Sequence, residues 1–273
     1  MKQGLSSEFI YQIFALLIAV IVVHAVYVGA IRPAANAQLE REAALLAAGE
    51  DVIAERSLVV VVRDFEQEAC FILLIWALAI MGYKARLNSQ EGALLEQRLL
   101  DIPEGTTLLP QDAREYSRSL EALPAAQQDL LLPRTLLSAL QRFATTGSIQ
   151  AVSDTVREQC DVEADRLDSE MSMVRYIAWA IPSIGFIGTV RGIGDALGQA
   201  YKAVEGDISG VTASLGVAFN STFVALVLSI IIMFFLHQLQ QSQERLVLNC
   251  QRYADRRLLR FLVANTAAKT AAS

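Results

Sequence analysis

Small and weakly polar residues line one side of an apolar stretch in the C-terminal half of the chain, AWAIPSIGFIGTVRGIGDALG, at 178–198. At helical spacing they share a face: Pro182, Gly185, Thr189, Gly192 and Ala196. Gly188 and Gly192 also form a GxxxG pair. Such residues let two helix backbones approach closely, and a hydroxyl inside a membrane can bond to a neighbouring helix, to water or to a protonatable group. The face therefore suits either helix packing or the wall of a pore.

A second apolar stretch, residues 211–236, repeats this pattern. Its small face carries Ser214, Ala218, Ser221 or Thr222, Ala225 and Ser229. Bulky residues are expected on the opposite side of the first stretch, at Ile181, Ile184, Ile187 and Val190. Thr189 and Thr222 thus place hydroxyls at the middle of two neighbouring helices. Periodicity favours simple packing and leaves a pore as the alternative, because Ser and Thr often only bond their own helix.

Apolar segments long enough to cross a membrane position these residues. A helix needs about 20 mainly apolar residues to cross the hydrocarbon core, and hydrophobic residues make up 53% of this chain. Residues 9–31, 173–197 and 211–236 meet this requirement, and residues 69–83 meet it with help from the basic residues that follow them. The prediction is an all-α polytopic membrane protein with four transmembrane helices.

The first apolar segment allows a second interpretation. Ala-Asn-Ala at 35–37 fits the small-residue cleavage site of a signal peptide. The apolar run is longer than the usual core of about 7 to 15 residues, which favours a retained helix. Cleavage would leave three transmembrane helices.

Lysine and arginine near the span ends set the expected orientation, because they favour the cytoplasm. They follow the second and fourth spans, so both termini are expected inside, and long helices are expected to extend from the spans into the cytoplasm. The predicted segments are a first transmembrane helix at 1–31, a periplasmic or interfacial segment at 32–68, a second transmembrane helix at 69–83, a cytoplasmic helical domain at 84–172, a transmembrane hairpin at 173–236 and a cytoplasmic C-terminal helix at 237–273.

Composition and motifs argue against several other classes of protein. The net charge of −6 gives no basic field for nucleic acid. Cys70, Cys160 and Cys250 are far apart and have no histidine near them, so neither a zinc site nor a disulfide framework is indicated. The sequence has no Ser-His-Asp set and no phosphate-binding loop. No enzyme activity, metal or cofactor is predicted.

Few ionisable residues lie in the apolar segments. His24 invites a proton-relay role, although a lone histidine more often packs or bonds to a partner. Arg191 and Asp195 are four residues apart on one helix face, and an ion pair in an outer vestibule is favoured over a direct role in proton uptake. The fourth span has no Asp, Glu, Lys or Arg. A proton path would therefore need a carboxylate from another polypeptide.

Two motifs resemble those of the MotA/TolQ/ExbB proton channel family. PSIGFIGTVRGI, residues 182–193, is similar to its Pro-x-x-Gly-x-x-Gly-Thr-Val-x-Gly-Ile signature, and LGVAFNSTFVALVLSI, residues 215–230, resembles a second, looser signature. The first motif is closest to TolQ, ExbB and ZorA-like subunits, whereas two N-terminal spans resemble the four-span MotA branch. Arg191, Asn220 and Ser221 depart from the usual pattern by being charged or more polar.

The resemblance implies a function and an assembly. It implies a homopentamer around a dimer of a single-span ExbD/TolR/MotB-like protein, whose membrane Asp carries the proton. Thr189 and Thr222 match the pore threonines, with Ser221 beside them and Pro182 as the proline of the first pore helix. Gly185, Gly188, Gly192 and Ala218 remain as packing residues. The implied protein couples proton motive force to mechanical work in the bacterial inner membrane.

A different class of function fits the same residues. In a non-conducting membrane scaffold, the small faces would only pack helices, and the cytoplasmic helices would recruit proteins. A small-solute transporter is a weaker third possibility, because no inverted repeat is visible in the sequence.

Overall fold

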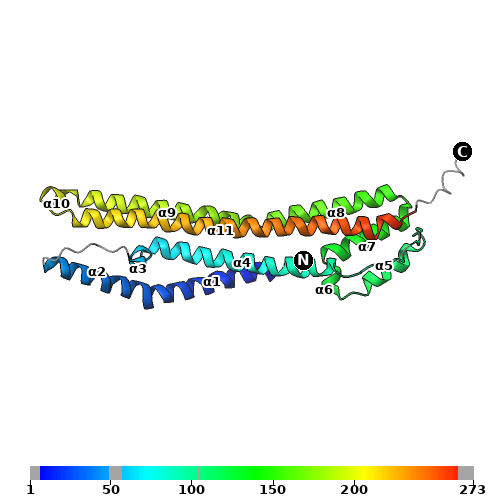
Figure 1. The fold of residues 1–273 in the computed structure, drawn as a ribbon, viewed down its shortest axis with the longest axis horizontal. Coiled ribbons are helices and arrows are strands. Elements are labelled where there is room, and N and C mark those ends of the chain that lie inside the picture. The colour runs from blue at the N-terminus through cyan, green and yellow to red at the C-terminus, as the bar shows by residue number, and fades with distance from the viewer. Residues whose placement is uncertain (1–6, 49–56, 104, 264–273) are drawn as a thin grey trace, which may run out of the picture. The chain divides into compact units, whose positions relative to one another are not determined.

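The computed structural model describes residues 7–48, 57–103 and 105–263, and nearly all of them are helical (Figure 1). Within these residues there is no strand, and one isolated β-bridge joins Leu108 and Leu262. Four helical runs are long and apolar enough to cross a membrane: Glu8–Glu42, Phe65–Leu95, Ile149–Gly198 and Ser209–Phe261. The predicted all-α class with four membrane-spanning helices is therefore confirmed. Parts of four predicted segments, at 1–6, 49–56, 104 and 264–273, lie outside the described residues.

Backbone contacts divide the chain into two compact units, each formed by segments far apart in the sequence. Unit 1 comprises Met1–Gly82 and Met173–His237, and unit 2 comprises Tyr83–Ser172 and Gln238–Ser273. Helices α4 (Phe65–Leu95) and α11 (Ser209–Arg257) contribute residues to both units. Unit 1 also contains α1 (Ser7–Val26), the π-helical turn η1 (Tyr27–Ile31), α2 (Arg32–Ala47), α3 (Leu58–Val61), nearly all of α9 (Ser172–Gly198) and α10 (Ala200–Val204). Unit 2 also contains α5 (Ala113–Glu121), α6 (Ala125–Gln128), α7 (Leu131–Thr146), α8 (Ile149–Glu170) and the 3-10 turn η2 (Leu259–Phe261).

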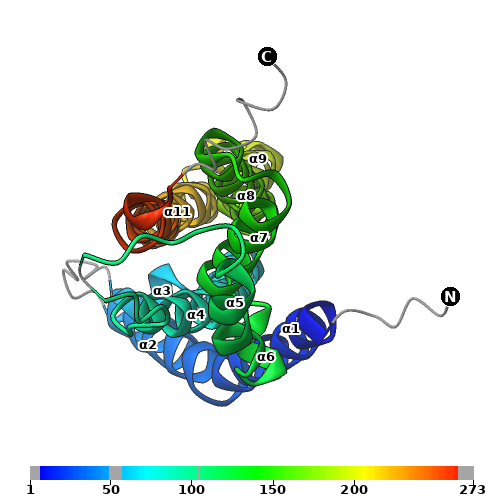
Figure 2. The same ribbon diagram turned by 90° about the vertical axis from the view of Figure 1, so that its right-hand side faces the viewer.

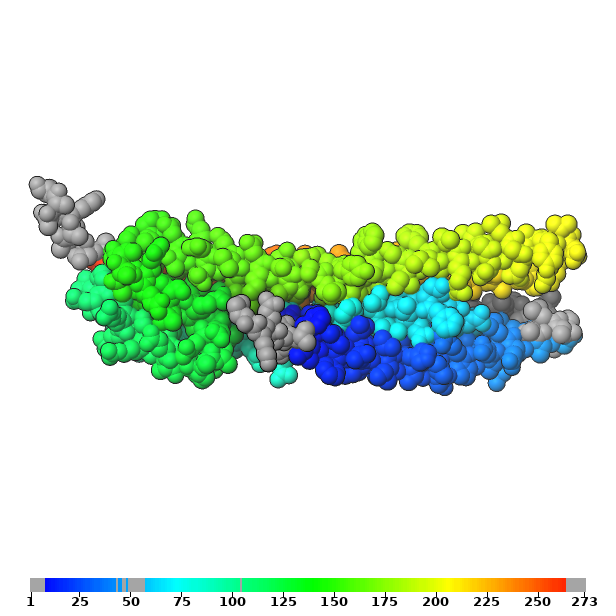
Figure 3. Space-filling view, turned by 180° about the vertical axis from the view of Figure 1, so that it is seen from behind, coloured from blue at the N-terminus to red at the C-terminus, as the bar shows by residue number. Residues whose placement is uncertain are grey.

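In unit 1, α4 lies between the N-terminal helices and the pair formed by α9 and α11 (Figure 1, Figure 3). On the α1 side, the Trp76 Nε1–H donates to the Gln12 carbonyl oxygen at 2.9 Å, and the Tyr11 hydroxyl donates to the Ala79 carbonyl oxygen at 3.2 Å. On the other side, the Cys70 thiol contacts the Ile181 carbonyl oxygen at 3.7 Å. These contacts place α4 against both neighbours.

The helices are longer than the predicted spans. α1 continues through η1 into α2, so the helical run passes Ile31 and ends at Ala47. α4 begins at Phe65 and not at residue 69, which makes the acidic segment before the apolar run helical. The first extension is rich in Ala and the second consists mainly of Glu and Gln, and all three residue types are strong helix formers.

The connection between α9 and α11 turns at a glycine. It contains the short helix α10 and Gly206, whose φ of 99° lies in the left-handed region that glycine tolerates. The hydroxyl and the backbone N–H of Ser209 both donate to the exposed Asp207 carboxylate. These hydrogen bonds lower the pKa of Asp207, and they fix the start of α11.

In unit 2, α5, α7 and α8 surround one apolar core together with the C-terminal part of α11 (Figure 2). α7 is followed by Gly147, with a φ of 61°, and the next helix is capped by Ser148, whose hydroxyl accepts from the Ala151 N–H at 3.3 Å. The core includes Leu120, Leu136, Leu140, Phe143, Val152, Ala254 and Leu258. The apolar faces of short amphipathic helices thus meet in a single core.

A buried carboxylate joins α7 to α8 inside unit 2. Glu163 is 2% exposed and accepts from Arg134 at 2.7 Å and from Arg166 at 2.6 Å. We expect Glu163→Gln to lower the free energy of unfolding by about 1–3 kcal/mol, because two arginines lose their counter-charge. Thermal unfolding followed by circular dichroism measures this. Glu158→Gln, an exposed position on the same helix, is the control, and an equal loss there would contradict the prediction.

Candidate functional site

Helices α9 and α11 touch at three glycines. A methyl group on Gly185 would lie 2.5 Å from the Ala225 Cβ, and one on Gly188 would lie 2.5 Å from the Ser221 Cβ. At Gly192 the nearest atoms belong to backbone, since a Cβ would lie 2.7 Å from the Ala218 nitrogen. All three distances are shorter than van der Waals contact allows. The structure thus places the four proposed packing residues, Gly185, Gly188, Gly192 and Ala218, where the two backbones approach most closely.

Pro182 frees a carbonyl that α11 then binds. Proline has no N–H, so the Ala178 carbonyl oxygen lacks its usual partner four residues on. The Ser229 hydroxyl of α11 donates to this oxygen at 3.2 Å. A membrane offers no water to satisfy a free carbonyl, so this bond couples the proline to the serine across the pair. The sequence pattern placed Ser229 on the small face without indicating this partner.

Ile181 lies on the packed face of α9, which corrects the expectation that it lies on the outer side. It is fully buried, whereas Ile187 and Val190 are exposed as expected. The cause is α4, whose Cys70 contacts the Ile181 carbonyl. A third helix therefore covers part of α9 that a two-helix pattern left open.

Thr189 and Thr222 meet across the interface between α9 and α11. Their hydroxyls are hydrogen-bonded to each other. Thr189 Oγ1 also lies 3.1 Å from the Ala218 carbonyl oxygen, and Thr222 Oγ1 lies 3.1 Å from the Gly185 carbonyl oxygen. Because each hydroxyl has one proton, one threonine donates to the other while the second donates to a carbonyl. The pair therefore has two hydrogen-bond directions of similar geometry.

The segment that contains this pair matches a known family. Residues 127–252 match the family model of the MotA/TolQ/ExbB proton channel family. The chain contains a MotA/TolQ/ExbB domain. This domain includes α7, α8, α9, α10 and most of α11, and the resemblance of the two motifs is confirmed. No curated protein and no solved structure matches the chain.

The match over residues 127–252 supports a proton-channel-type role in general, and the four long apolar helices indicate a multi-pass membrane protein. The family is one of channels and transporters and not of enzymes. Helices α1 to α4 lie outside the matched segment. Of these N-terminal helices, α4 contacts the domain through Glu66 and Gln67.

Ser221 does not join the threonine pair of the domain. It is buried, and its hydroxyl donates to the Val217 carbonyl oxygen at 2.9 Å. The Gln67 amide of α4 donates to the same hydroxyl at 3.4 Å. Ser221 therefore lies at the contact with α4, and its hydroxyl is not part of the threonine pair beside which it was expected.

Arg191 pairs with a residue of α4. Its guanidinium lies 2.7 Å from one carboxylate oxygen of Glu66 and 2.8 Å from the other. Among the described residues Arg191 forms no ion pair with Asp195, so the proposed Arg191–Asp195 pair is wrong. The reason is geometric: α4 brings a carboxylate to Arg191 across the interface, while Asp195 stays exposed.

The new pairing leads to a stability prediction. Glu66→Gln and Arg191→Gln should each lower the melting temperature of the purified protein, and the double variant should lose less than the sum, because the two charges act as a pair. The expected coupling is about 1 kcal/mol, since Arg191 is partly exposed. Asp195→Asn is the control and should leave the melting temperature unchanged. Additive losses, or a loss in the control, would contradict the pairing.

Three polar residues in the first turn of α4 were not singled out from the sequence. Glu66 binds Arg191, Gln67 binds Ser221, and Glu68 binds His24 and Arg32. Gln67 is fully buried, and its Oε1 has no hydrogen-bond partner among the residues that the structure describes. A usable signal was present, because Glu-Gln-Glu directly precedes the apolar run. Polar residues at membrane depth mark functional positions by default.

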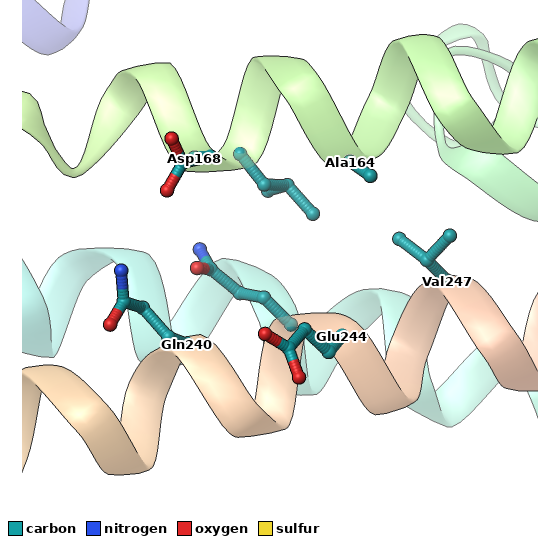
Figure 4. Close-up of a pocket in the computed structure, with 7 residues that line it drawn as sticks. Ala164, Asp168, Gln240, Glu244 and Val247 are labelled. Carbon is teal, nitrogen blue, oxygen red and sulfur yellow. The ribbon is translucent and has the colours of Figure 1, made fainter.

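Unit 2 contains a small hollow between α8 and α11, apart from the threonine pair (Figure 4). Its volume of about 70 Å³ suits a few water molecules and is well below that of a metabolite pocket. Across residues 7–48, 57–103 and 105–263, no group of three or more His, Cys, Asp or Glu is arranged to hold a metal ion. The hollow is lined by Ala164, Leu167, Asp168, Gln240, Gln243, Glu244 and Val247.

Proposed function

We propose that this chain is a stator-type proton channel subunit, which couples proton motive force to mechanical work through a single-span partner in the bacterial inner membrane. The observation that carries the proposal is the hydrogen-bonded pair of Thr189 and Thr222. It lies inside a domain of a proton channel family and has two alternative hydrogen-bond directions. A hydroxyl pair of this kind can accept a hydrogen bond from a protonated group and can also donate a hydrogen bond to an acceptor.

The proton-carrying carboxylate is expected to come from the partner. The membrane part of α11, residues 211–236, has no ionisable side chain. The two glutamates in the first turn of α4, Glu66 and Glu68, are already paired with arginines. A membrane Asp on a single-span partner would supply the missing group, in a homopentamer around a dimer of that partner.

The energy available is sufficient for mechanical steps. A charge that crosses a potential of 100 mV releases about 2.3 kcal/mol. A threonine pair that only orients a partner carboxylate consumes little of this free energy, because each hydrogen bond that breaks is replaced by another. Repeated proton steps can then drive movement of the partner against the subunits.

The second candidate, a non-conducting scaffold, has one observation in its favour. Both threonine hydroxyls find partners inside the hairpin, as residues that only pack two helices would. The two candidates differ in what a threonine substitution does, because a scaffold needs assembly but no hydroxyl.

Mass spectrometry of the intact complex, purified in mild detergent from native membranes, tests the proposal. Five copies of this chain with two copies of a single-span protein that carries one membrane Asp would support it. That partner's remaining domain would then indicate which process is driven. A homo-oligomer alone, found repeatedly, would favour the scaffold.

A further inference from the structure

A histidine, a glutamate and an arginine form a chain of contacts inside unit 1. His24 Nδ1 of α1 lies 2.6 Å from one carboxylate oxygen of Glu68, and Arg32 of α2 binds the other oxygen. The Glu68 side chain is 8% exposed, whereas the His24 side chain is 58% exposed. The trio therefore links a buried carboxylate to an imidazole at the surface of the chain.

A rare backbone feature aligns His24 with Arg32. In an uninterrupted α-helix each residue turns by about 100°, so residues eight positions apart, such as His24 and Arg32, would point about 80° away from each other. The π-helical turn η1 lies between them and takes up one extra residue. Arg32 is thereby brought back to nearly the same side as His24. Isolated π turns occur frequently at functional sites, and this one lets a single carboxylate contact both side chains.

We propose that His24, Glu68 and Arg32 form a reversible proton-binding site that belongs to this chain, with Nε2 of His24 as the atom that takes up and releases the proton. Glu68 accepts the hydrogen bond from Nδ1–H and so fixes which nitrogen stays protonated. Nε2 is then the free acceptor on the exposed ring. The site deepens the proposed channel function by adding a proton-binding group outside the threonine pair.

Arg32 makes the site reversible. A lone Glu68 carboxylate would hold His24 in its charged form, because an opposite charge at this distance strongly favours the imidazolium. Arg32 binds the other oxygen of that carboxylate and offsets part of its charge. In the Ser-His-Asp arrangement a carboxylate likewise orients the imidazole and does not itself take the proton. Here the arginine limits how far the carboxylate biases the ring.

The other titratable groups around the trio leave this balance in place. Tyr27 of η1 is buried, its hydroxyl has no hydrogen-bond partner, and Arg32 stacks over its ring at 5.7 Å. Burial raises the pKa of Asp64, which lies just before α4 beside Arg63. The remaining neighbours are Cys70 of α4, a buried thiol, and Glu66 of α4, which is paired with Arg191 of α9.

The chain has only two histidines, His24 and His237, which makes the site accessible to nuclear magnetic resonance. The full-length protein, labelled with ¹⁵N-histidine and held in lipid nanodiscs, gives one set of ring signals for each. We expect His24 to gain and lose a proton in the range where an imidazole can titrate, about pH 5 to 8. In its neutral form it should carry the proton on Nδ1. His237, which is exposed and lies outside the trio, is the internal reference.

Two substitutions should act in opposite directions. Glu68→Gln should lower the ratio of protonated to neutral His24 at pH 6.5 about tenfold, and Arg32→Gln should raise it about tenfold. Asp195→Asn, which removes an exposed carboxylate outside the trio, is the control and should leave the ratio nearly unchanged. Shifts in the same direction in both variants would contradict the charge balance that the proposal requires.

Wild-type protein alone can overturn the proposal. A His24 ring that stays neutral, or stays charged, over the whole pH range would do so, as would a neutral form with its proton on Nε2. Equal ratios in wild type, Glu68→Gln and Arg32→Gln would have the same meaning. The titration needs no partner protein, so its failure would leave the motor proposal standing, and failure of the motor proposal would leave this site intact.

Discussion

Replacing Gly192 by alanine is expected to separate α9 from α11 and to lower the free energy of unfolding by about 3 kcal/mol or more. The added methyl would lie 2.7 Å from both the Ala218 nitrogen and the Ser214 carbonyl oxygen. These are backbone atoms, so no side-chain rotation relieves the overlap. Thermal unfolding of the detergent-purified protein, with gel filtration for the size of the complex, measures the effect.

Gly194→Ala is the matched control for this substitution. It lies two residues away on the same helix, and nothing lies within 4 Å of the methyl it would add. Alanine favours a helix over glycine by about 1 kcal/mol, so this variant should be as stable as the wild type or slightly more so. The two changes therefore have opposite expected signs. Equal behaviour would mean that the two helices do not meet at Gly192.

Thr189→Val and Thr222→Val are expected to leave the complex assembled and to reduce its proton-driven output more than tenfold, which is about 1.4 kcal/mol in the barrier. Valine keeps nearly the same shape and removes the hydroxyl. The stability lost should be about 1 kcal/mol for each variant, because the Gly185 and Ala218 carbonyls keep the backbone bonds of their own helices. Proton flux into liposomes that hold the native complex and a pH-sensitive dye measures the output.

Two further variants make this test decisive. Thr212→Val removes an exposed hydroxyl that donates to the Ile208 carbonyl oxygen, just before the start of α11, at 3.0 Å, and should keep full flux. Thr189→Ser retains the hydroxyl and should recover most of the flux lost in Thr189→Val. Full flux in both valine variants would mean that the threonines only pack the hairpin, and would favour the scaffold.

The sequence alone determined the class of the protein and the face on which its hairpin packs. Apolar segments of sufficient length require membrane helices, because backbone groups in lipid must bond within their own helix. Glycine and threonine recurring every three or four residues define one side of a helix, so Gly185, Gly188, Gly192 and Thr189 could be grouped before any coordinates were known. The spacing of the same residues carried the family resemblance.

Only the tertiary structure decided which residues pair across helices. Arg191 binds Glu66, 125 positions away, and His24 binds Glu68, 44 positions away. No period links such residues, and the nearest opposite charge in the sequence, Asp195, was the wrong partner for Arg191. Ile181 was misplaced for a related reason, because a pattern on one helix cannot show that a third helix covers it. The alignment of His24 with Arg32 depends on one π turn, and a regular helix would have turned the two side chains apart.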